Sequence, residues 1–446
     1  MTPEVKQRIE QIRQGIVPEG YVKDKDGIYP RDWASKKIGQ WLKLAERSIV
    51  LQDEEEYQLV TIRRGFGGVD SRGSFLGKNV LVKNYFIVKT GDFIISKRQI
   101  AHGACGIVPP ELDGAVVSNE YNVFLPQDGT NIQMFNLMMQ LPHYKRLFYL
   151  MSDGVHIEKL LFKTQDWMKR TLAMPLLKEQ KKIAEILATQ DKAIELQARK
   201  IEELKRFKKG CLEKMFPRKG QKVPEKRFPG FTDDWEQRKL GDVVQITMGQ
   251  SPDGSTYSDE PSDYILVQGN ADLQNGWVCP RIWTTQITKK ADAGDLIMSV
   301  RAPAGAMGKT AYNAVIGRGV AAIKGNEFIY QLLVKMDTDG FWKTLSCGST
   351  FESLNSDNIK NAAVKIPTTA EQIKIGGFFQ YLDNLITLHQ RKLEEMKRQK
   401  KALMQLLLTG IVRVQGNRFC CDFRDDEERN ARNAVKGGES YGNESP

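Results

Sequence analysis

The chain has 446 residues, 41% of them hydrophobic and 27% charged, and its formal net charge is +11 at pH 7. This length predicts two to four domains, and no apolar run approaches the ~20 residues that a membrane span needs. The basic balance favours a polyanionic partner, with nucleic acid ahead of an anionic membrane surface. Because the N-terminal residues contain no apolar signal segment, we expect a cytoplasmic protein.

The cysteines and histidines predict no metal site. The six cysteines are scattered without a Cys-x-x-Cys pair, and the four histidines show no ligand spacing. Structural zinc sites use closely spaced cysteine pairs, and disulfide frameworks use dense, regularly spaced cysteines. We therefore expect reduced thiols and no metal bound by this chain.

Residues 1–32 form an N-terminal lead-in with the helical pattern TPEVKQRIEQIRQGI, which we expect to pack onto a long helix further along the chain. Residues 33–174 follow, with short runs rich in β-branched residues, such as VLVKNYFIV and FIIS, between turn residues. Helical stretches such as IQMFNLMMQLPHYKRLFYLM are interspersed. This mixture predicts an α+β domain.

Residues 175–216 predict one long helix. Apolar residues recur in steps of four and three from Ile183, which is the spacing of a coiled-coil seam, and Pro175 stands where a first helical turn needs no N–H. Gln197 and Lys208 are polar positions on the same lattice. The predicted seam residues of this helix are Ile183, Leu187, Ile194, Ile201 and Leu204.

The same order returns after a basic, Pro/Gly-rich linker at 217–234 and a second strand-rich segment at 235–366. Residues 367–414 contain a second long helix that aligns with the first without a gap, and its polar lattice positions are His389 and Lys400. An ungapped match of this length indicates a duplication. The predicted seam residues of the second helix are Ile375, Phe379, Leu382, Ile386, Leu393 and Met396.

The polar interruptions coincide in the two helices, which favours their pairing with each other over separate packing on their own domains. The two domains share anchors as well, because DWASKKIGQ and GDFIISKR in the first match DWEQRKLGD and GDLIMSVR in the second. We predict an α+β fold in which two homologous domains are separated by two long antiparallel coiled-coil helices with pseudo-two-fold symmetry. The polar tail at 415–446 is expected to be disordered.

One stretch resembles an enzyme motif. APAGAMGKT, residues 302–310, ends like a phosphate-binding loop, but Pro303 occupies the position of the first motif glycine and no helical pattern follows. A turn shared by both domains explains it better. We found no nucleophile with a matching base, and we predict no catalytic residue in this chain.

Two ordered copies of these motifs resemble the DNA specificity subunit of type I restriction-modification systems. The resemblance runs from residue 33 to 414 and includes KVPEKRFPGFTDDWEQRKLGD, LLLTGIVRV, and Pro-x-x-x-Glu-Gln-x-Lys-Ile at the start of both helices. It implies that residues 33–174 and 235–366 are target recognition domains, each reading one half of a bipartite site in double-stranded DNA. It also implies that the helices set the spacer between the half-sites and dock partner subunits.

The resemblance further implies which partners and cofactors to expect. Two methyltransferase subunits would use S-adenosylmethionine to methylate adenine, and two motor–nuclease subunits, which use ATP and Mg²⁺, can join them. This chain itself would hold no cofactor, would have no membrane partner and would work in the cytoplasm of a bacterium or archaeon.

The domains differ most between their shared anchors, as expected if each reads a different half-site. Base edges carry the sequence information, whereas phosphates supply much of the affinity. The candidate DNA contacts are Arg63, Arg64, Lys97, Arg98 and His102 in the first domain and Gln268, Asn270, Arg301, Lys309 and Arg318 in the second.

Three other functions fit parts of the sequence. A stand-alone sequence-specific DNA-binding protein or regulator would bind its site tightly without partner subunits. An enzyme built on the GAMGKT turn would lose activity in a Lys309→Ala variant. A coiled-coil adaptor for proteins alone would not show DNA binding that falls steeply with salt.

Overall fold

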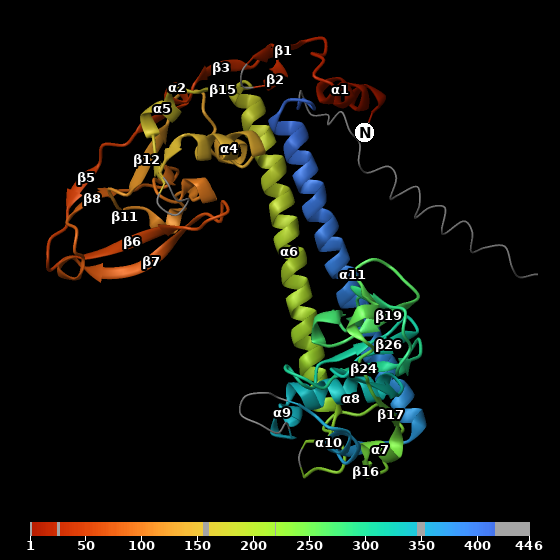
Figure 1. Ribbon diagram of the computed structural model, residues 1–446. Helices are drawn as coiled ribbons and strands as arrows, with labels where there is room; N and C mark the ends of the chain where they lie inside the picture. Colours follow the sequence, from red (N-terminus) through yellow and green to blue (C-terminus); the bar gives the residue numbers. More distant parts are fainter. Residues whose placement is uncertain (1, 25–26, 155–159, 219, 346–352, 415–446) are drawn as a thin grey trace, which may run out of the picture. The chain divides into compact units, whose positions relative to one another are not determined.

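The computed structural model describes residues 2–24, 27–154, 160–218, 220–345 and 353–414 (Figure 1). The chain divides into two compact units, one made of residues 1–194 and 396–446 and the other of residues 195–395. Each of the two long helices begins in one unit and ends in the other. The tail that we expected to be disordered lies outside the described residues.

The first domain lies in the first unit and contains two sheets, with strand orders β10-β9-β12-β4 and β5-β8-β11-β6-β7. A short antiparallel pair, β3 with β15, joins the domain's beginning to its end. The strands are β3 (Ala34–Lys37), β4 (Leu42–Leu44), β5 (Ser48–Val50), β6 (Glu56–Ile62), β7 (Val69–Leu76), β8 (Asn84–Ile87), β9 (Phe93–Ser96), β10 (Cys105–Ile107), β11 (Val116–Ser118), β12 (Tyr121–Pro126), β13 (Ser152–Asp153), β14 (Leu161–Phe162) and β15 (Thr171–Met174).

Helices close this domain on the side of an aromatic core. Phe93 of β9 meets Phe135 edge-on with ring centroids 5.3 Å apart, and both are fully buried. The single helical stretch expected at 132–151 is instead broken in two, because Pro142 has no N–H to donate and begins a new helix. The helices of the domain are α2 (Ile38–Trp41), α3 (Ile132–Met139), α4 (Pro142–Leu150) and α5 (Thr164–Met168).

The second domain lies in the second unit and has sheets of order β17-β27-β24-β25-β21-β20 and β18-β22-β19-β26-β23. Its strands are β16 (Glu236–Lys239), β17 (Gln245–Met248), β18 (Tyr257–Ser258), β19 (Tyr264–Val267), β20 (Leu273–Gln274), β21 (Trp277–Val278), β22 (Ile282–Thr284), β23 (Lys290–Ala291), β24 (Leu296–Ser299), β25 (Met307–Lys309), β26 (Ala314–Ile316), β27 (Val320–Lys324) and β28 (Ala363–Ile366). Its helices are α7 (Leu240–Val243), α8 (Glu327–Thr338), α9 (Phe341–Leu345) and α10 (Ser356–Lys360).

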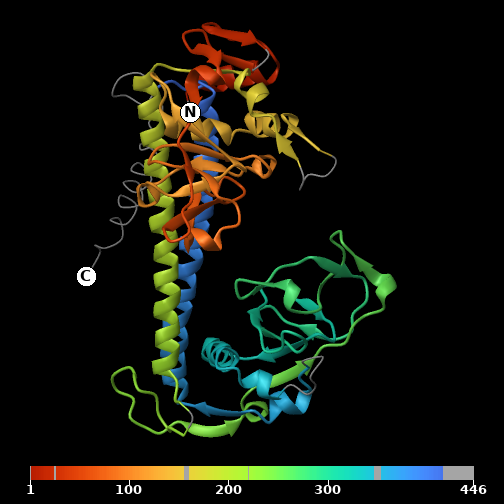
Figure 2. The same ribbon diagram turned by 90° about the vertical axis from the view of Figure 1, so that its left-hand side faces the viewer.

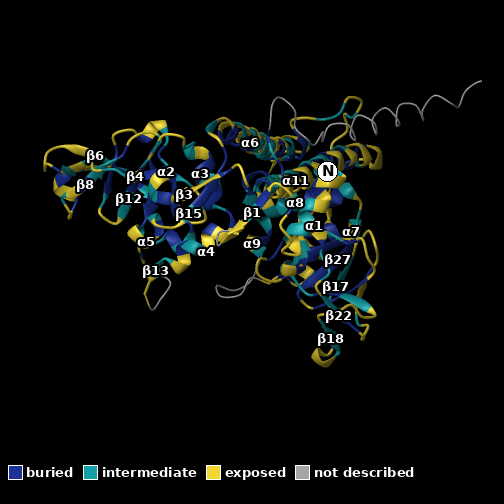
Figure 3. Ribbon diagram, turned by 90° about the horizontal axis from the view of Figure 1, so that it is seen from above, coloured by how far each residue is buried: buried dark blue, intermediate teal, exposed yellow. Residues whose placement is uncertain are grey.

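The two domains repeat one topology. The order β10-β9-β12-β4 returns as β25-β24-β27-β17, and β8-β11-β6-β7 returns as β23-β26-β19-β22. In each domain the second of these sheets contains one parallel pair, β6 with β11 and β19 with β26. The short strand pair that joins beginning to end also recurs, as β16 with β28. Turns on the domain surfaces are largely exposed, whereas central strands such as β27 are largely buried (Figure 3).

Two long helices, α6 (Leu177–Met215) and α11 (Thr369–Leu408), are antiparallel partners. In the first unit, the start of α6 shares a core with the end of α11, where Ile183 and Leu187 lie in one cluster with Leu407. In the second unit the end of α6 shares a core with the start of α11 (Figures 1 and 2). These findings confirm the predicted α+β fold with two homologous domains and an antiparallel helix pair.

Most of the predicted seam residues are buried between the two helices and the domains. Three of them, Ile194, Leu393 and Met396, are half-buried, and the other eight are buried. The helices begin two residues after the prolines expected to open them, and each proline carbonyl accepts a hydrogen bond from a glutamine side chain inside the helix. Gln180 donates to Pro175 at 2.8 Å and Gln372 to Pro367 at 3.0 Å.

The N-terminal segment packs where α11 ends. Helix α1 (Pro3–Arg13) donates from Arg8 to the carbonyl oxygen of Ile411 at 2.6 Å. Tyr21, in the hairpin of β1 (Tyr21–Asp24) and β2 (Gly27–Pro30), donates to the carbonyl of Gly410 at 2.7 Å. The lead-in therefore contacts the residues that follow the second helix.

Candidate nucleic-acid interface

In the second domain, several strands end at one edge of the sheets. Strands β19 and β26 are parallel and end together, while β17 and β24 both run antiparallel to β27 and end where it begins. Main-chain hydrogen bonds join the turns, with Gly317 donating to Val267 at 2.8 Å and Val300 to Gly319 at 2.9 Å. We call this surface the turn edge of the second domain; it comprises residues 249–252, 268–272, 300–303 and 317–319.

Glycines let these turns approach each other closely. A Cβ atom on Gly319 would lie 1.9 Å from the carbonyl oxygen of Gln268, and one on Gly249 would lie 2.1 Å from that of Gly317. No other residue type fits such positions without moving the neighbouring main chain. The main chains of these turns are therefore packed closely against one another. This packing fixes the positions from which the outward side chains project.

Four of the five candidate residues of the second domain lie on this edge. Arg318 donates from Nε to Ser251 Oγ at 3.4 Å, and its N–H donates to the same oxygen at 3.2 Å. Gln268 and Asn270 are half-buried in the neighbouring turn, and Arg301 is exposed after β24. Within the described part of the chain, neither Arg301 nor Arg318 forms an ion pair, so both guanidinium charges are uncompensated.

The equivalent edge of the first domain holds its five candidates. We call residues 63–68, 97–103 and 119–120, which follow β6, β9 and β11, the turn edge of the first domain. The glycine-rich tip after β6 is fastened to the next turn, because Gly65 donates to the carbonyl of His102 at 2.7 Å and Phe66 to that of Gly103 at 2.8 Å. This brings Arg64 into the same surface as His102.

Two arginines of this edge, Arg63 and Arg98, contact carboxylates. Arg98 donates from Nε to Glu120 at 2.7 Å, and Lys97 donates its N–H to the carbonyl of Glu120 at 2.9 Å. Arg63 forms an ion pair with Asp70. Sequence reasoning missed both acidic partners, since Glu120 lies 22 residues from Arg98 and only the strand order brings them together.

Lys309 does not belong to this interface. It ends β25, which runs antiparallel to β24, so it lies at the opposite edge of the sheet. Its ammonium is 2.9 Å from Glu327, only 12% of its side chain is exposed, and it lies over the rings of Trp277 and Tyr330. Because this charge is neutralised inside the domain, we remove Lys309 from the candidate DNA contacts. The GAMGKT stretch that contains it enters a strand and begins no helix.

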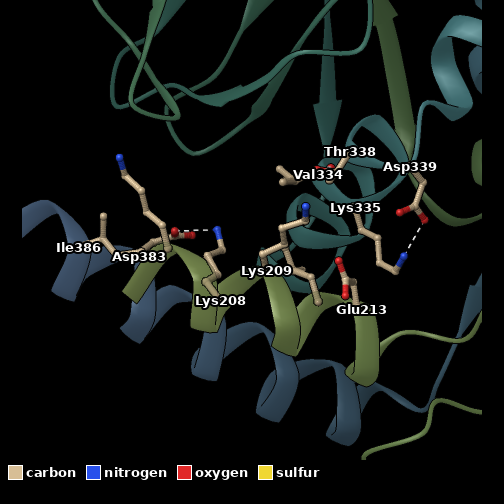
Figure 4. Close-up of a pocket in the computed structure, with 11 residues that line it drawn as sticks. Lys208, Lys209, Glu213, Val334, Lys335, Thr338, Asp339, Asp383 and Ile386 are labelled. Carbon is tan, nitrogen blue, oxygen red and sulfur yellow. Dashed lines mark hydrogen bonds and ion pairs between the residues drawn. The ribbon is translucent and has the colours of Figure 1, made fainter. Parts of the chain in front are cut away.

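A pocket of about 330 Å³ lies between α6 and α8 in the second unit (Figure 4). Its charged groups are largely paired with one another. Lys208 is 2.7 Å from Asp383 on α11, and Lys335 on α8 is 2.6 Å from Asp339, the residue after that helix. The first pair joins the two long helices and the second lies within the domain, so these four groups are mutually neutralised.

Among the described residues, no group of three or more His, Cys, Asp or Glu side chains is arranged to hold a metal ion. None of the described helices has the length and apolar content of a membrane span. Cys105 is fully buried, and burial raises the pKa of its thiol well above the ordinary value, which keeps it protonated.

An ion-pair cluster fastens each helix start to a segment distant in sequence. Arg413, after α11, contacts Glu179 at 2.8 Å and Asp32 at 2.7 Å, and its hydrogen bond lowers the pKa of the Asp32 carboxyl. Arg227, after α6, makes the matching contact with Glu371 at 2.7 Å. Both long helices open with the dipeptide Glu-Gln, and this shared dipeptide was the sequence signal that could have pointed to the two clusters.

The two turn edges can bind a polyanion whose surface also carries hydrogen-bonding groups. Guanidinium groups make paired hydrogen bonds to phosphates and to guanine edges, and amides such as Gln268 match adenine edges. The guanidinium and amide side chains both lie on rigid turns, and this arrangement suits recognition more than catalysis. The edges therefore have the chemistry of a nucleic-acid interface.

Comparisons with known proteins agree with this geometry. Residues 30–206 and 232–398 both match the sequence model of the type I restriction modification DNA specificity domain. The MjaX type I restriction enzyme specificity subunit of Methanocaldococcus jannaschii is 27% identical over 420 residues, which cover 89% of this chain and 97% of the relative.

Two solved structures share the fold. A chain from a study of complex assembly and conformational transition of the type I R-M system aligns with a TM-score of 0.57 at 22% identity, over 86% of this chain and 99% of its own. The type I restriction-modification S subunit from M. genitalium aligns with a TM-score of 0.54 at 14% identity, over 84% and 96%. Because the family match covers most of the sequence in two copies, the chain belongs to the type I restriction modification DNA specificity domain family.

Proposed function

We propose that this chain is the DNA-recognition subunit of a type I restriction-modification complex, in which each domain reads one half of a bipartite site. One observation supports this most directly. Two domains of one topology carry cationic and amide side chains on equivalent turn edges, and those turns differ in sequence while the strand order is the same. Shared sheets with different turns are what two readers of different half-sites require.

The helix pair sets the number of base pairs between the half-sites and docks two methyltransferase subunits. Leu196 on α6 and its repeat counterpart Leu388 on α11 are both more than 60% exposed, which is unusual for leucine in a paired helix. Two equivalent apolar positions suit two copies of the same partner, since related surfaces bind identical subunits.

The chemistry belongs to the partners in this proposal. The methyltransferase subunits use S-adenosylmethionine to methylate the N6 atom of adenine, and motor–nuclease subunits, where they join, use ATP and Mg²⁺. This chain is non-catalytic and contributes the position on DNA at which those subunits act.

Mapping of methylated adenines tests the proposal. The chain is co-expressed with its methyltransferase partners, and genomic DNA is sequenced for N6-methyladenine. We expect one bipartite motif with a fixed spacer. Tight sequence-specific binding by the purified chain alone, without any methylation on co-expression, would instead indicate a stand-alone DNA-binding protein.

The role of the helices has its own test. One heptad is inserted after Gln197 in α6 and one after His389 in α11, so that the seam continues on both sides. Seven residues lengthen an α-helix by ~10 Å, which is about three base pairs of DNA. We expect unchanged half-sites separated by a spacer about three base pairs longer. Altered half-sites with the original spacer would argue against this role.

A further inference from the structure

The two domains carry one arginine at an equivalent place. Arg98 ends GDFIISKR in the first domain and Arg301 ends GDLIMSVR in the second, two residues after β9 and β24. The residue before each donates its N–H across the turn edge, from Lys97 to Glu120 and from Val300 to Gly319, at 2.9 Å in both cases. The same main-chain arrangement therefore carries both arginines.

The residue that accepts this main-chain hydrogen bond differs between the domains. In the first domain it is Glu120, whose carboxylate accepts from Arg98 Nε at 2.7 Å and from Nη2 at 3.5 Å. Both side chains are about half exposed, so a ligand can reach them. In the second domain the position is Gly319, and a Cβ atom there would lie 1.9 Å from the carbonyl of Gln268. The second domain therefore cannot carry a carboxylate side chain at the position equivalent to Glu120.

This difference separates two kinds of DNA contact. A phosphate is attracted to an isolated guanidinium but is repelled by a carboxylate a few ångströms from it, and the Arg98–Glu120 pair has no net charge. The pair places the guanidinium donors of Arg98 next to the carboxylate acceptors of Glu120. In the major groove, guanine presents two acceptors, N7 and O6, and its partner cytosine presents the N4 donor.

We propose that the Arg98–Glu120 pair reads one G·C base pair in the half-site of the first domain, while Arg301 contacts a phosphate at the equivalent place in the second. Arg98 donates to guanine, and Glu120 holds its guanidinium and accepts from cytosine. The inference rests on the proposed DNA-recognition function and assigns different tasks to two residues of common origin.

The test uses the complex with its methyltransferase partners and duplexes carrying the mapped target or each single base-pair change in it. Glu120→Gln keeps the size of the side chain and removes its charge, Arg98→Gln removes the donor pair, and Arg301→Gln is the matched control. Dissociation constants are measured at several salt concentrations, and thermal melting verifies that each variant is folded.

We expect Glu120→Gln and Arg98→Gln to lose discrimination at one G·C position of one half-site, by about 5- to 150-fold, with other positions unchanged. The slope of log Kd against log salt should stay constant for Arg98→Gln and fall by about 1 for Arg301→Gln, whose effect should be equal on all sequences.

A uniform loss of affinity in Arg98→Gln with a slope lowered by about 1 would make Arg98 a phosphate contact and overturn the inference. So would full discrimination in folded Glu120→Gln. Failure of the proposed function looks different, since the unmodified complex would then bind all duplexes alike.

Discussion

Gln197 on α6 donates from its side-chain nitrogen to Nδ1 of His389 on α11 at 2.9 Å and to the carbonyl oxygen of the same residue at 2.8 Å. The two residues occupy the same position of the two repeats. A residue can meet its own repeat counterpart only where the antiparallel pair has its local two-fold axis. The polar interruption seen in both helices is therefore one contact at the centre of the pair.

This contact should fix the register of the helices at a cost in stability. Gln197→Ala removes two hydrogen bonds and should lower the free energy of unfolding by about 1 kcal/mol. The double variant Gln197→Leu/His389→Leu makes the seam apolar and should recover that loss or exceed it. Urea unfolding measures both, and a double variant less stable than Gln197→Ala would contradict the assignment.

The repeats contain a second reciprocal contact, Lys208 with Asp383 at 2.7 Å and Lys400 with Asp191 at 2.5 Å. The first is the more buried, and Asp383 also accepts from Gln331 at 2.8 Å. Lys208→Ala leaves that carboxylate without its cation and should lower the free energy of unfolding by roughly 2 kcal/mol.

Lys400→Ala is the matched control for that variant. Half of the Asp191 side chain is exposed, so the loss should stay below about 1 kcal/mol and shrink in high salt. Equal losses in the two variants would show that burial does not separate the pairs.

The Asp32–Arg413 contact predicts a pH dependence. The hydrogen bond from Arg413 lowers the pKa of Asp32 below its ordinary value of 3.8. Since the folded pKa is the lower one, the stabilisation is present above pH ~4 and is lost as the pH falls through the folded pKa. Asp32→Asn should therefore be less stable than the unmodified protein at pH 7, and the two should converge once the pH has fallen below the folded pKa of Asp32. Thermal melting between pH 2.5 and 7 measures this, and a constant difference would exclude the linkage.

Lys309 provides a test of the interface itself. Lys309→Met leaves Glu327 without its cation, so the free energy of unfolding should fall by roughly 1–3 kcal/mol. DNA affinity and its salt dependence should not change in the folded variant, because this charge lies at the opposite edge from the proposed DNA contacts. A salt slope reduced as in Arg301→Gln would return Lys309 to the interface.

The sequence alone predicts the duplication and the paired helices, because both are carried by local, regular patterns. Seam residues such as Ile183 and Phe379 recur at the period of one helical face, and the ungapped alignment identifies the second copy. The resemblance that these repeats support also predicts the family. For the duplication and for the helix pair alike, the signal lies in the spacing of residues along the chain.

Only the tertiary structure decides which side chains of the turns act together. Glu120 lies beside Arg98, and Asp32 beside Arg413, because strand order and antiparallel helices join segments far apart in the sequence. The direction of β25 places Lys309 at the opposite edge from the other candidate residues of its domain and beside a carboxylate. Charge and residue type are read from the chain, but the edge that a residue occupies depends on the direction of its strand, which no local pattern specifies.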